Sequence, residues 1–271
     1  MKKTKLCIDL IQNAEIELEE QIPIIKDCGF DGIFTCFWGE ERMKRLATLA
    51  KNHDLAFQSV HAPFSDVVSM WREKEDAKPF IEHLLRSVES SADIGAPVLV
   101  MHVFKGYEYP DTPNEIGVER FYKVIKRAKE LGVTVAFENT EGEEFLACLM
   151  TAFKSEKNVG FCWDTGHENC YNGSRDMLAL YGDRLACTHI NDNVGCTFPS
   201  GQIGNRDDLH LFPFDGKINW EKSMERLQKA NQLDWLTFEL KKKSYPDVSI
   251  EEFLKTAYER AEKIKSLYDR E

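Results

Sequence analysis

The stretch KELGVTVAF (residues 129–137) places a glycine between the end of an amphipathic segment and a short apolar run. The same arrangement occurs in DCGFDGIF (27–34) and in ADIGAPVLV (92–100). Glycine directly after a helix is a common stop signal, and a continuous apolar run is typical of a parallel strand covered on both faces. These three stretches therefore predict repeated helix–turn–strand units and an α/β fold with a parallel sheet.

Outward from these units, eight short apolar runs predict strands: Lys5–Leu10, Gly32–Phe37, Ala56–His61, Val98–Val103, Thr134–Glu138, Val159–Trp163, Leu185–Ile190 and Trp235–Leu240. Amphipathic segments between them predict helices: Glu17–Cys28, Glu40–Asn52, Lys78–Ile94, Asn114–Leu131, Glu143–Phe153, Ser174–Tyr181, Trp220–Ala230 and Ser249–Tyr268. Eight units in 271 residues favour a single (β/α)8 TIM barrel over residues 1–271, with its active site at the C-terminal face of the strands. An open doubly wound sheet is the alternative for the same units.

Composition narrows the classes of partner. The net charge of −11 and the lack of a basic face make a nucleic acid an improbable partner, and a neutral or cationic small substrate fits better, or an anion held by a metal. The longest apolar runs are too short to cross a membrane, and the N-terminus lacks a signal peptide, so we expect a cytoplasmic protein without membrane association. The eight cysteines form no CxxC pair, which disfavours a cysteine zinc site. A disulfide framework is equally disfavoured in a cytosolic chain of this size. The sequence does not indicate the oligomeric state.

Imidazoles and carboxylates collect at the ends of the predicted strands. Five of the seven histidines lie at these ends or in the loops that follow them: His61, His102, His167, His189 and His210. The carboxylates there are Glu138, Asp164 and Glu239, with Asp192 and Asp208 after the seventh strand. In a parallel barrel these ends converge on one face, so residues far apart in the sequence would share a cavity. The other two, His53 and His83, lie in or beside helices and should be surface residues.

Clustered, buried carboxylates repel one another and are costly to desolvate, and a divalent cation removes this difficulty. Mixed ligation by histidine and carboxylate suits Zn²⁺, Mn²⁺, Co²⁺ or Fe²⁺. Each residue alone has a plainer interpretation: a strand histidine is often structural, either glutamate can belong to a buried ion pair, and Asp164 can cap a helix. Their joint placement is what predicts a metal site.

At these residues the sequence resembles the xylose isomerase-like barrels, a superfamily that includes sugar isomerases and epimerases, inosose dehydratases and endonuclease IV. The resemblance covers essentially the whole chain. Its most specific pieces are FCWDTGH (161–167), THIND (188–192), DLH (208–210) followed by PFDGKINW, and FEL around Glu239. It implies a TIM barrel with a divalent metal, and a sugar or polyol as substrate.

Two branches of this superfamily imply different ligand sets. Similarity to the ketose 3-epimerases implies one metal on Glu138, Asp164, His189 and Glu239, with the two glutamates as the catalytic proton-transfer pair. That branch has an arginine where this chain has Gly195, and Arg206 is a possible substitute. Similarity to endonuclease IV implies more than one ion on a fuller set: His61, His102, Glu138, Asp164, His167, His189, Asp208, His210 and Glu239.

The leading hypothesis is a metal-dependent sugar isomerase or epimerase that acts through an enediolate of a ketose-like or polyol substrate. His61, His167, Arg206 and Trp38 would bind the substrate, and Phe64, Trp71, Phe198 and Phe212 in the long loops are candidates to close over it. The alternatives are an endonuclease IV-like multi-zinc phosphodiester hydrolase, an inosose dehydratase-type lyase and a non-catalytic sugar-binding protein. Metal count and reaction product would separate them.

Overall fold

Eight parallel strands form one sheet in the computed structural model, which describes residues 4–107, 111–173, 175–199 and 201–270. The strands are β1 (Lys5–Asp9), β2 (Gly32–Cys36), β3 (Ala56–His61), β4 (Val98–Met101), β5 (Thr134–Glu138), β6 (Val159–Asp164), β7 (Leu185–His189) and β8 (Trp235–Phe238). Their order in the sheet is β7-β6-β5-β4-β3-β2-β1-β8. A parallel bridge between Ile190 and Phe238 joins the two outer strands, so the eight strands close into a (β/α)8 TIM barrel. The barrel prediction is confirmed, and the open sheet is excluded.

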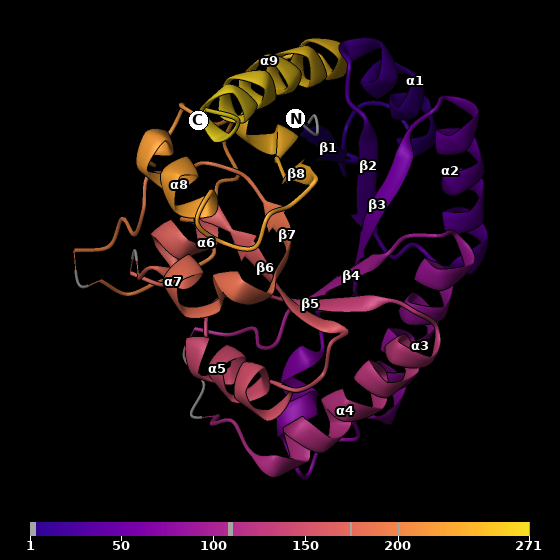
Figure 1. The fold of residues 1–271 in the computed structure, drawn as a ribbon, viewed down its shortest axis with the longest axis vertical. Helices are drawn as coiled ribbons and strands as arrows, with labels where there is room; N and C mark the ends of the chain where they lie inside the picture. The colour runs from indigo at the N-terminus through magenta and orange to yellow at the C-terminus, as the bar shows by residue number, and fades with distance from the viewer. Residues whose placement is uncertain (1–3, 108–110, 174, 200, 271) are drawn as a thin grey trace.

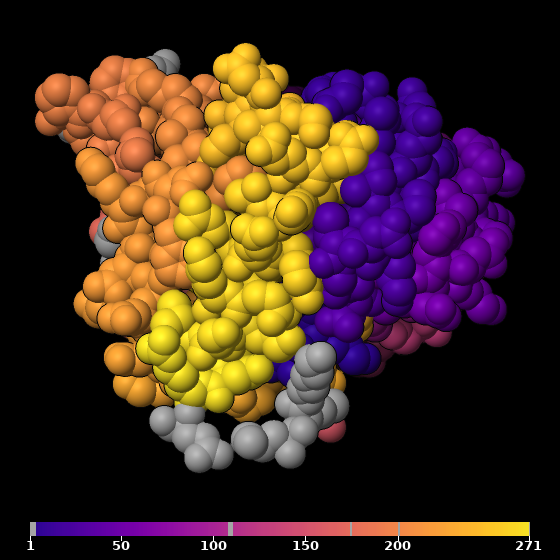
Figure 2. All heavy atoms as spheres, turned by 90° about the horizontal axis from the view of Figure 1, so that it is seen from above, coloured from indigo at the N-terminus to yellow at the C-terminus, as the bar shows by residue number. Residues whose placement is uncertain are grey.

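The helices surround the strands as an outer ring (Figure 1). They are α1 (Leu18–Cys28), α2 (Glu40–Asn52), α3 (Lys78–Asp93), α4 (Glu115–Glu130), α5 (Glu143–Ala152), α6 (Thr165–Cys170), α7 (Met177–Tyr181), α8 (Trp220–Leu227) and α9 (Ile250–Tyr268). Three short 3₁₀ helices lie between these elements in the described residues: η1 (Val67–Trp71), η2 (Gly182–Arg184) and η3 (Lys242–Ser244). Helix α9 lies between the N-terminal segment and the segment around α8 (Figure 2).

The predicted elements are present, with bounds shifted at several ends. Strands β1, β2, β4, β7 and β8 end one or two residues earlier than expected, and β6 continues to Asp164. The expected helix Ser174–Tyr181 begins at Met177 because the Asp176 side chain accepts the N–H of Ala179 at 2.9 Å, and Ser174 lies outside the described residues. Helix α6 was not expected.

Two apolar regions pack against the sheet. The larger lies between the strands and the helices, and it includes Trp71 and Phe212, which are therefore core residues rather than covers for a substrate. The smaller comprises Val98, Val100, Ala136, Cys162 and Cys187. Residues two positions apart on a strand point to the same face, so Glu138, Asp164 and His189 point to the same face as Ala136, Cys162 and Cys187. The three donor residues therefore lie inside the barrel, at its mouth.

All eight cysteines are free, as expected. Across the described ranges, no helix is both long and apolar enough to span a lipid bilayer.

Candidate metal centre

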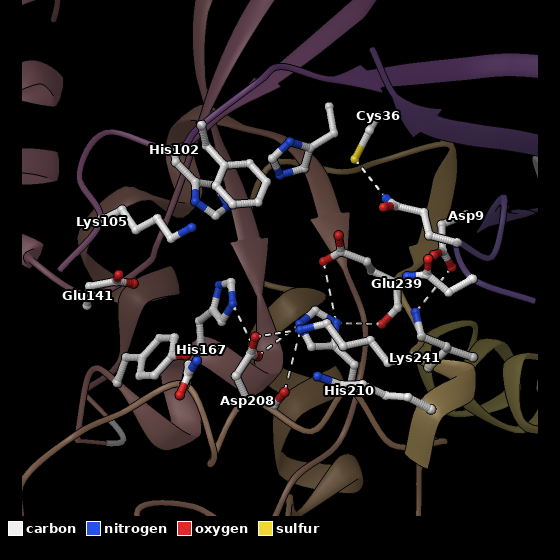
Figure 3. Close-up of a pocket in the computed structure, with 18 of the residues that line it drawn as sticks. Asp9, Cys36, His102, Lys105, Glu141, His167, Asp208, His210, Glu239 and Lys241 are labelled. Carbon is white, nitrogen blue, oxygen red and sulfur yellow. Dashed lines mark hydrogen bonds and ion pairs between the residues drawn. The ribbon is translucent and has the colours of Figure 1, made fainter. Parts of the chain in front are cut away.

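The C-terminal ends of the strands bring together the side chains that the sequence predicted. His61, Glu138, Asp164 and His189 are the last residues of β3, β5, β6 and β7. His102 and Glu239 directly follow β4 and β8, His167 lies in α6, and Asp208 and His210 lie in the loop after β7. Figure 3 shows His167, Asp208, His210 and Glu239 directed toward one another around a shared cavity.

Glu138 lies at the centre of the cluster, with no exposed surface. Its Oε2 atom lies 3.3 Å from Nε2 of His61 and 3.2 Å from Nε2 of His102. Its Oε1 atom lies 3.1 Å from Nδ1 of His189 and 3.4 Å from Nδ1 of His167. Burial alone would raise the pKa of this carboxyl, but the rings of His189 and His102 lower it well below its ordinary value. Glu138 is therefore a carboxylate that several imidazoles share.

Asp164 connects the sixth and seventh strands. It is paired with His189 in the β6–β7 ladder. Its Oδ1 atom accepts the backbone N–H of His167 at 2.7 Å, which caps α6 and brings the His167 ring toward the cluster. Its Oδ2 atom accepts a hydrogen bond from the Asn191 side chain at 2.9 Å. The helix cap and the place in the cluster are thus both properties of Asp164, and they are compatible because each carboxylate oxygen has two acceptor sites.

The two most specific sequence stretches are joined by hydrogen bonds. The Thr165 hydroxyl donates to the carbonyl of Asn191 at 2.6 Å and accepts the N–H of the same residue at 2.9 Å. The Asn193 side chain donates to the carbonyl of Gly166 at 2.7 Å. A side chain at Gly166 would collide with the amide of Asn191. The FCWDTGH and THIND stretches therefore fix the positions of Asp164, His167 and His189 relative to one another.

The other carboxylate after β7, Asp192, has a structural role. It is fully buried, and its oxygens accept the N–H groups of Phe214 at 3.0 Å, Ile218 at 3.1 Å and the Trp220 indole at 3.0 Å. These bonds tie the PFDGKINW stretch, which follows His210 in the same connection, to the end of the seventh strand. Asp192 is thus a support for the site.

A second carboxylate-centred group lies beside the first. Oδ1 of Asp208 lies 2.8 Å from Nε2 of His210 and 3.4 Å from Nε2 of His167. Burial would raise the pKa of Asp208, but His210 and His167 lower it well below its ordinary value. Lys241 also pairs with Asp208, at 2.6 Å from Oδ2. Despite these short distances, Oδ1 of Asp208 forms no hydrogen bond of normal geometry among the described residues.

Backbone carbonyls orient three of the imidazoles. Nδ1 of His61 lies 2.8 Å from the carbonyl of Ala62, Nδ1 of His167 lies 3.0 Å from that of Asn139, and Nδ1 of His210 lies 3.0 Å from that of Glu239. A neutral ring that donates from Nδ1 has Nε2 free to bind a metal. Histidines that bind metals are usually held in this way, by a second hydrogen bond that fixes the tautomer.

The histidines also balance the charge of the carboxylates. Burial lowers the pKa of His167 and His189, but the carboxylates raise both well above the ordinary value: Asp164 and Asp208 act on His167, and Glu138 and Glu239 act on His189. A histidine must be neutral to bind a metal, so a cation would take over this balance and release protons.

The donor atoms are close enough to share ions. The described residues contain five sets whose donors all lie within 4.8 Å of one another: Glu138, Asp164, His189 and Glu239; His61, His102 and Glu138; His61, His189 and Glu239; Asp164, His167 and His210; and Cys162, Cys187 and His189. The first set has three oxygens and one nitrogen, a mixture that Zn²⁺, Mn²⁺, Co²⁺ and Fe²⁺ accept. The residues present therefore fit a divalent cation, and the arrangement offers places for more than one.

A pocket of about 390 Å³ opens above this cluster. Its walls contain His61, His102, His167, Asp208, His210 and Glu239 from the predicted set. They also contain residues that the sequence reasoning missed: Asp9, Gln12, Asn13, Cys36, Lys105, Tyr107, Glu141, Tyr171, Asn205, Leu240 and the lysines 241–243. Asp9 ends β1, so the strand-end rule that found the other carboxylates would have found it too. Burial and the nearby Glu239 raise its pKa to about 8.

Two of the predicted substrate-binding residues lie outside the walls of this pocket. Trp38 is 40% exposed, and its indole N–H donates to the Thr35 hydroxyl at 3.1 Å. The Arg206 guanidinium lies over the ring of Phe198 and near Asp207. Both side chains are thus satisfied by local partners.

Known proteins are similar to this chain in sequence and in fold. The uncharacterized protein y4fM of Sinorhizobium fredii is 32% identical over 171 residues, which cover 59% of this chain and 52% of that protein. This chain thus spans about half the length of y4fM. Among solved structures, the IOLI protein with a bound zinc atom has a TM-score of 0.77 at 19% identity, over 98% of this chain and all of that one. A D-tagatose 3-epimerase-like protein has a TM-score of 0.72 at 20% identity, over 97% and 96% of the two chains.

The identities of 19% and 20% to the two solved structures establish a common fold and no more. A family model gives the classification: the model described as xylose isomerase-like TIM barrel matches residues 22–266. It confirms the resemblance inferred from the strand-end residues. Because the match covers most of the chain, the protein belongs to the xylose isomerase-like TIM barrel family.

Proposed function

We propose that this protein is a divalent-metal-dependent isomerase or epimerase of a ketose-like or polyol substrate. The observation that carries the proposal is that Glu138 and Glu239 belong to one donor set with Asp164 and His189, directly below an open pocket. The likeness in fold to a D-tagatose 3-epimerase-like protein and to the zinc-containing IOLI protein supports it.

The cation would be held by Glu138, Asp164, His189 and Glu239, and it would supply a Lewis acid that acidifies the C–H beside a substrate carbonyl. Glu239 would take that proton, and its position in the pocket wall and its 20% exposed side chain support this role. Burial would raise the pKa of Glu239, but His189 and His210 lower it below its ordinary value, so the carboxylate is in the form that a base requires.

Glu138 would act as the second member of the proton-transfer pair. It differs from Glu239 in being fully buried and surrounded by imidazoles. His61 and His167 line the pocket and would hydrogen-bond substrate hydroxyls or the oxyanion. Trp38 and Arg206 would contact the substrate only if their side chains left their present partners.

Solvent deuterium exchange tests the proposal directly. Protein loaded in turn with Mn²⁺, Zn²⁺, Co²⁺ or Fe²⁺ is incubated with a panel of ketoses and inososes in D₂O. We expect deuterium at the carbon beside the carbonyl of one substrate, together with a new epimer or isomer, and we expect a chelator to abolish both. The proposal fails if no member of the panel exchanges with any of the four metals.

His83 provides a control for the placement of the site. Its side chain is exposed on α3, where its ring packs edge-on against Phe37 at 5.5 Å. We expect His83→Ala to leave turnover and metal content unchanged and to alter the free energy of unfolding by about 0.5 kcal/mol or less. A large loss of turnover with normal folding would show that the site is not where we place it.

A phosphodiester hydrolase is a second candidate, favoured by the additional donor sets around His61, His102, His167 and His210. Several ions clustered in this way can activate water and stabilise a phosphoryl transition state. The strongly acidic chain argues against a nucleic-acid substrate.

Metal content separates these candidates. For the isomerase we expect one tightly bound ion per chain by elemental analysis, with exchange activity that saturates at one equivalent. Three ions per chain together with cleavage of abasic DNA would establish the hydrolase instead. One ion with loss of water from an inosose would indicate a dehydratase.

A further inference from the structure

Lysines gather at the pocket although the chain as a whole is acidic. Four of them line it, Lys105 and the run 241–243, against four lining carboxylates. One divalent cation bound below the pocket would offset the charges of the buried Glu138 and Asp164. With the charge of the buried carboxylates offset, the mouth of the site would be less negative than the rest of the protein. It would therefore admit an anion.

Two of the four lysines already have partners. Lys241 is paired with Asp208 at 2.6 Å, and Lys242 donates to a backbone carbonyl at 3.1 Å. Within the described part of the chain, Lys105 and Lys243 have neither an ion pair nor a hydrogen bond. Both side chains are exposed. Lys243 lies after β8, whereas Lys105 lies in the loop after β4, on the other side of the mouth.

Lys105 is held toward the metal donors by aromatic contacts. Its ammonium lies 4.8 Å from the centre of the Phe64 ring, and that ring stacks on His102 at 4.4 Å. Figure 3 shows the side chain reaching into the cavity beside His102. The nearby carboxylate of Glu141 accepts the N–H of Gly106 at 2.8 Å and forms no ion pair with Lys105. The charge of Lys105 is therefore available to a ligand.

A hydroxyl donor lies on the same side of the pocket. The hydroxyls of Tyr107 and Tyr171 are 2.9 Å apart, and both residues line the pocket. Tyr171 also stacks on His167, with 5.1 Å between ring centres. One of the two O–H groups is used in their mutual hydrogen bond, so the other can donate to a ligand.

We propose that Lys105, with this tyrosine pair, binds an anionic group of the substrate, either a phosphate ester or a carboxylate, remote from the reacting carbon. The substrate would then be a sugar phosphate or a sugar acid rather than a neutral sugar. This inference rests on the proposed function, because it concerns the substrate of the same site.

Binding to the metal-loaded protein tests the inference separately from catalysis. Calorimetry with D-fructose 6-phosphate, 5-keto-D-gluconate and D-fructose compares a phosphate, a carboxylate and a neutral probe. The variants are Lys105→Ala, Lys105→Arg, and Lys123→Ala as a matched control, because Lys123 is an exposed lysine on the outer helix α4. Metal content is measured in each, so that loss of the cation is not mistaken for loss of the lysine.

We expect at least one anionic probe to bind more tightly than D-fructose, and Lys105→Ala to weaken that probe about tenfold, since a charge-assisted hydrogen bond is lost. Lys105→Arg should restore most of the affinity, and the control should match the wild type. The inference is overturned if neither anion binds more tightly than D-fructose, or if Lys105→Ala weakens neutral and anionic probes alike. A lack of deuterium exchange with every ketose would instead overturn the proposed function.

Discussion

Replacing Glu138 by glutamine is expected to remove most of the bound metal and to abolish turnover. Glu138 is common to two of the donor sets, and its oxygens lie within 3.4 Å of nitrogens of four histidines. An amide of the same shape lacks the negative charge that attracts the cation. Loss of a partner that merely supports a ligand costs roughly 10- to 100-fold in metal affinity, and the loss of a ligand should exceed this.

The measurement is metal content after dialysis, combined with the exchange assay at saturating metal. Glu144→Gln is the matched control, because Glu144 is an exposed glutamate in the first turn of α5, the helix that follows β5. It should retain metal and activity. A Glu138→Gln protein with a full complement of metal and normal turnover would show that the cation is not held at the centre of this cluster.

Glu239→Gln is expected to have the second largest effect, mainly on the chemical step. Glu239 borders the pocket, and its Oε2 atom lies 3.4 Å from Nδ1 of His189. General acid–base catalysis contributes roughly 10²- to 10⁴-fold, so we expect the exchange rate at saturating metal to fall by about a thousandfold or more. Metal binding should weaken as well, though less than in Glu138→Gln, because Glu239 has fewer contacts within the cluster.

This prediction is tested by comparing the loss of deuterium exchange with the loss of metal binding in Glu239→Gln. Titration with metal should restore occupancy in Glu239→Gln without restoring deuterium exchange. If exchange returns together with occupancy, Glu239 is only a ligand, and the base must be sought elsewhere. Asp9 is then the next candidate, since it lines the same pocket.

Much of the site could be predicted from position alone. The histidines and carboxylates at strand ends converge as expected, because the ends of parallel strands in a closed barrel share one face. Asp9 obeys the same rule, because it is the last residue of β1, although it lies outside the most specific sequence stretches. Lys105, Tyr107, Glu141 and Tyr171 lie in loops and turns, whose side-chain directions no periodicity reveals.

The sequence by itself determined the number and order of the strands, the outer helices and the set of side chains at the mouth, because continuous apolar runs, amphipathic segments and glycine stops are local properties of the chain. Which donors lie within reach of one cation was decided only in the tertiary structure. The register shift between Phe161 and Cys162 aligns Asp164 with His189, and the bonds to Asp192 fix the loop that carries Asp208. To bind a metal, donor atoms that are far apart in the chain must be positioned to within a few tenths of an ångström. Only long-range packing sets their positions this accurately.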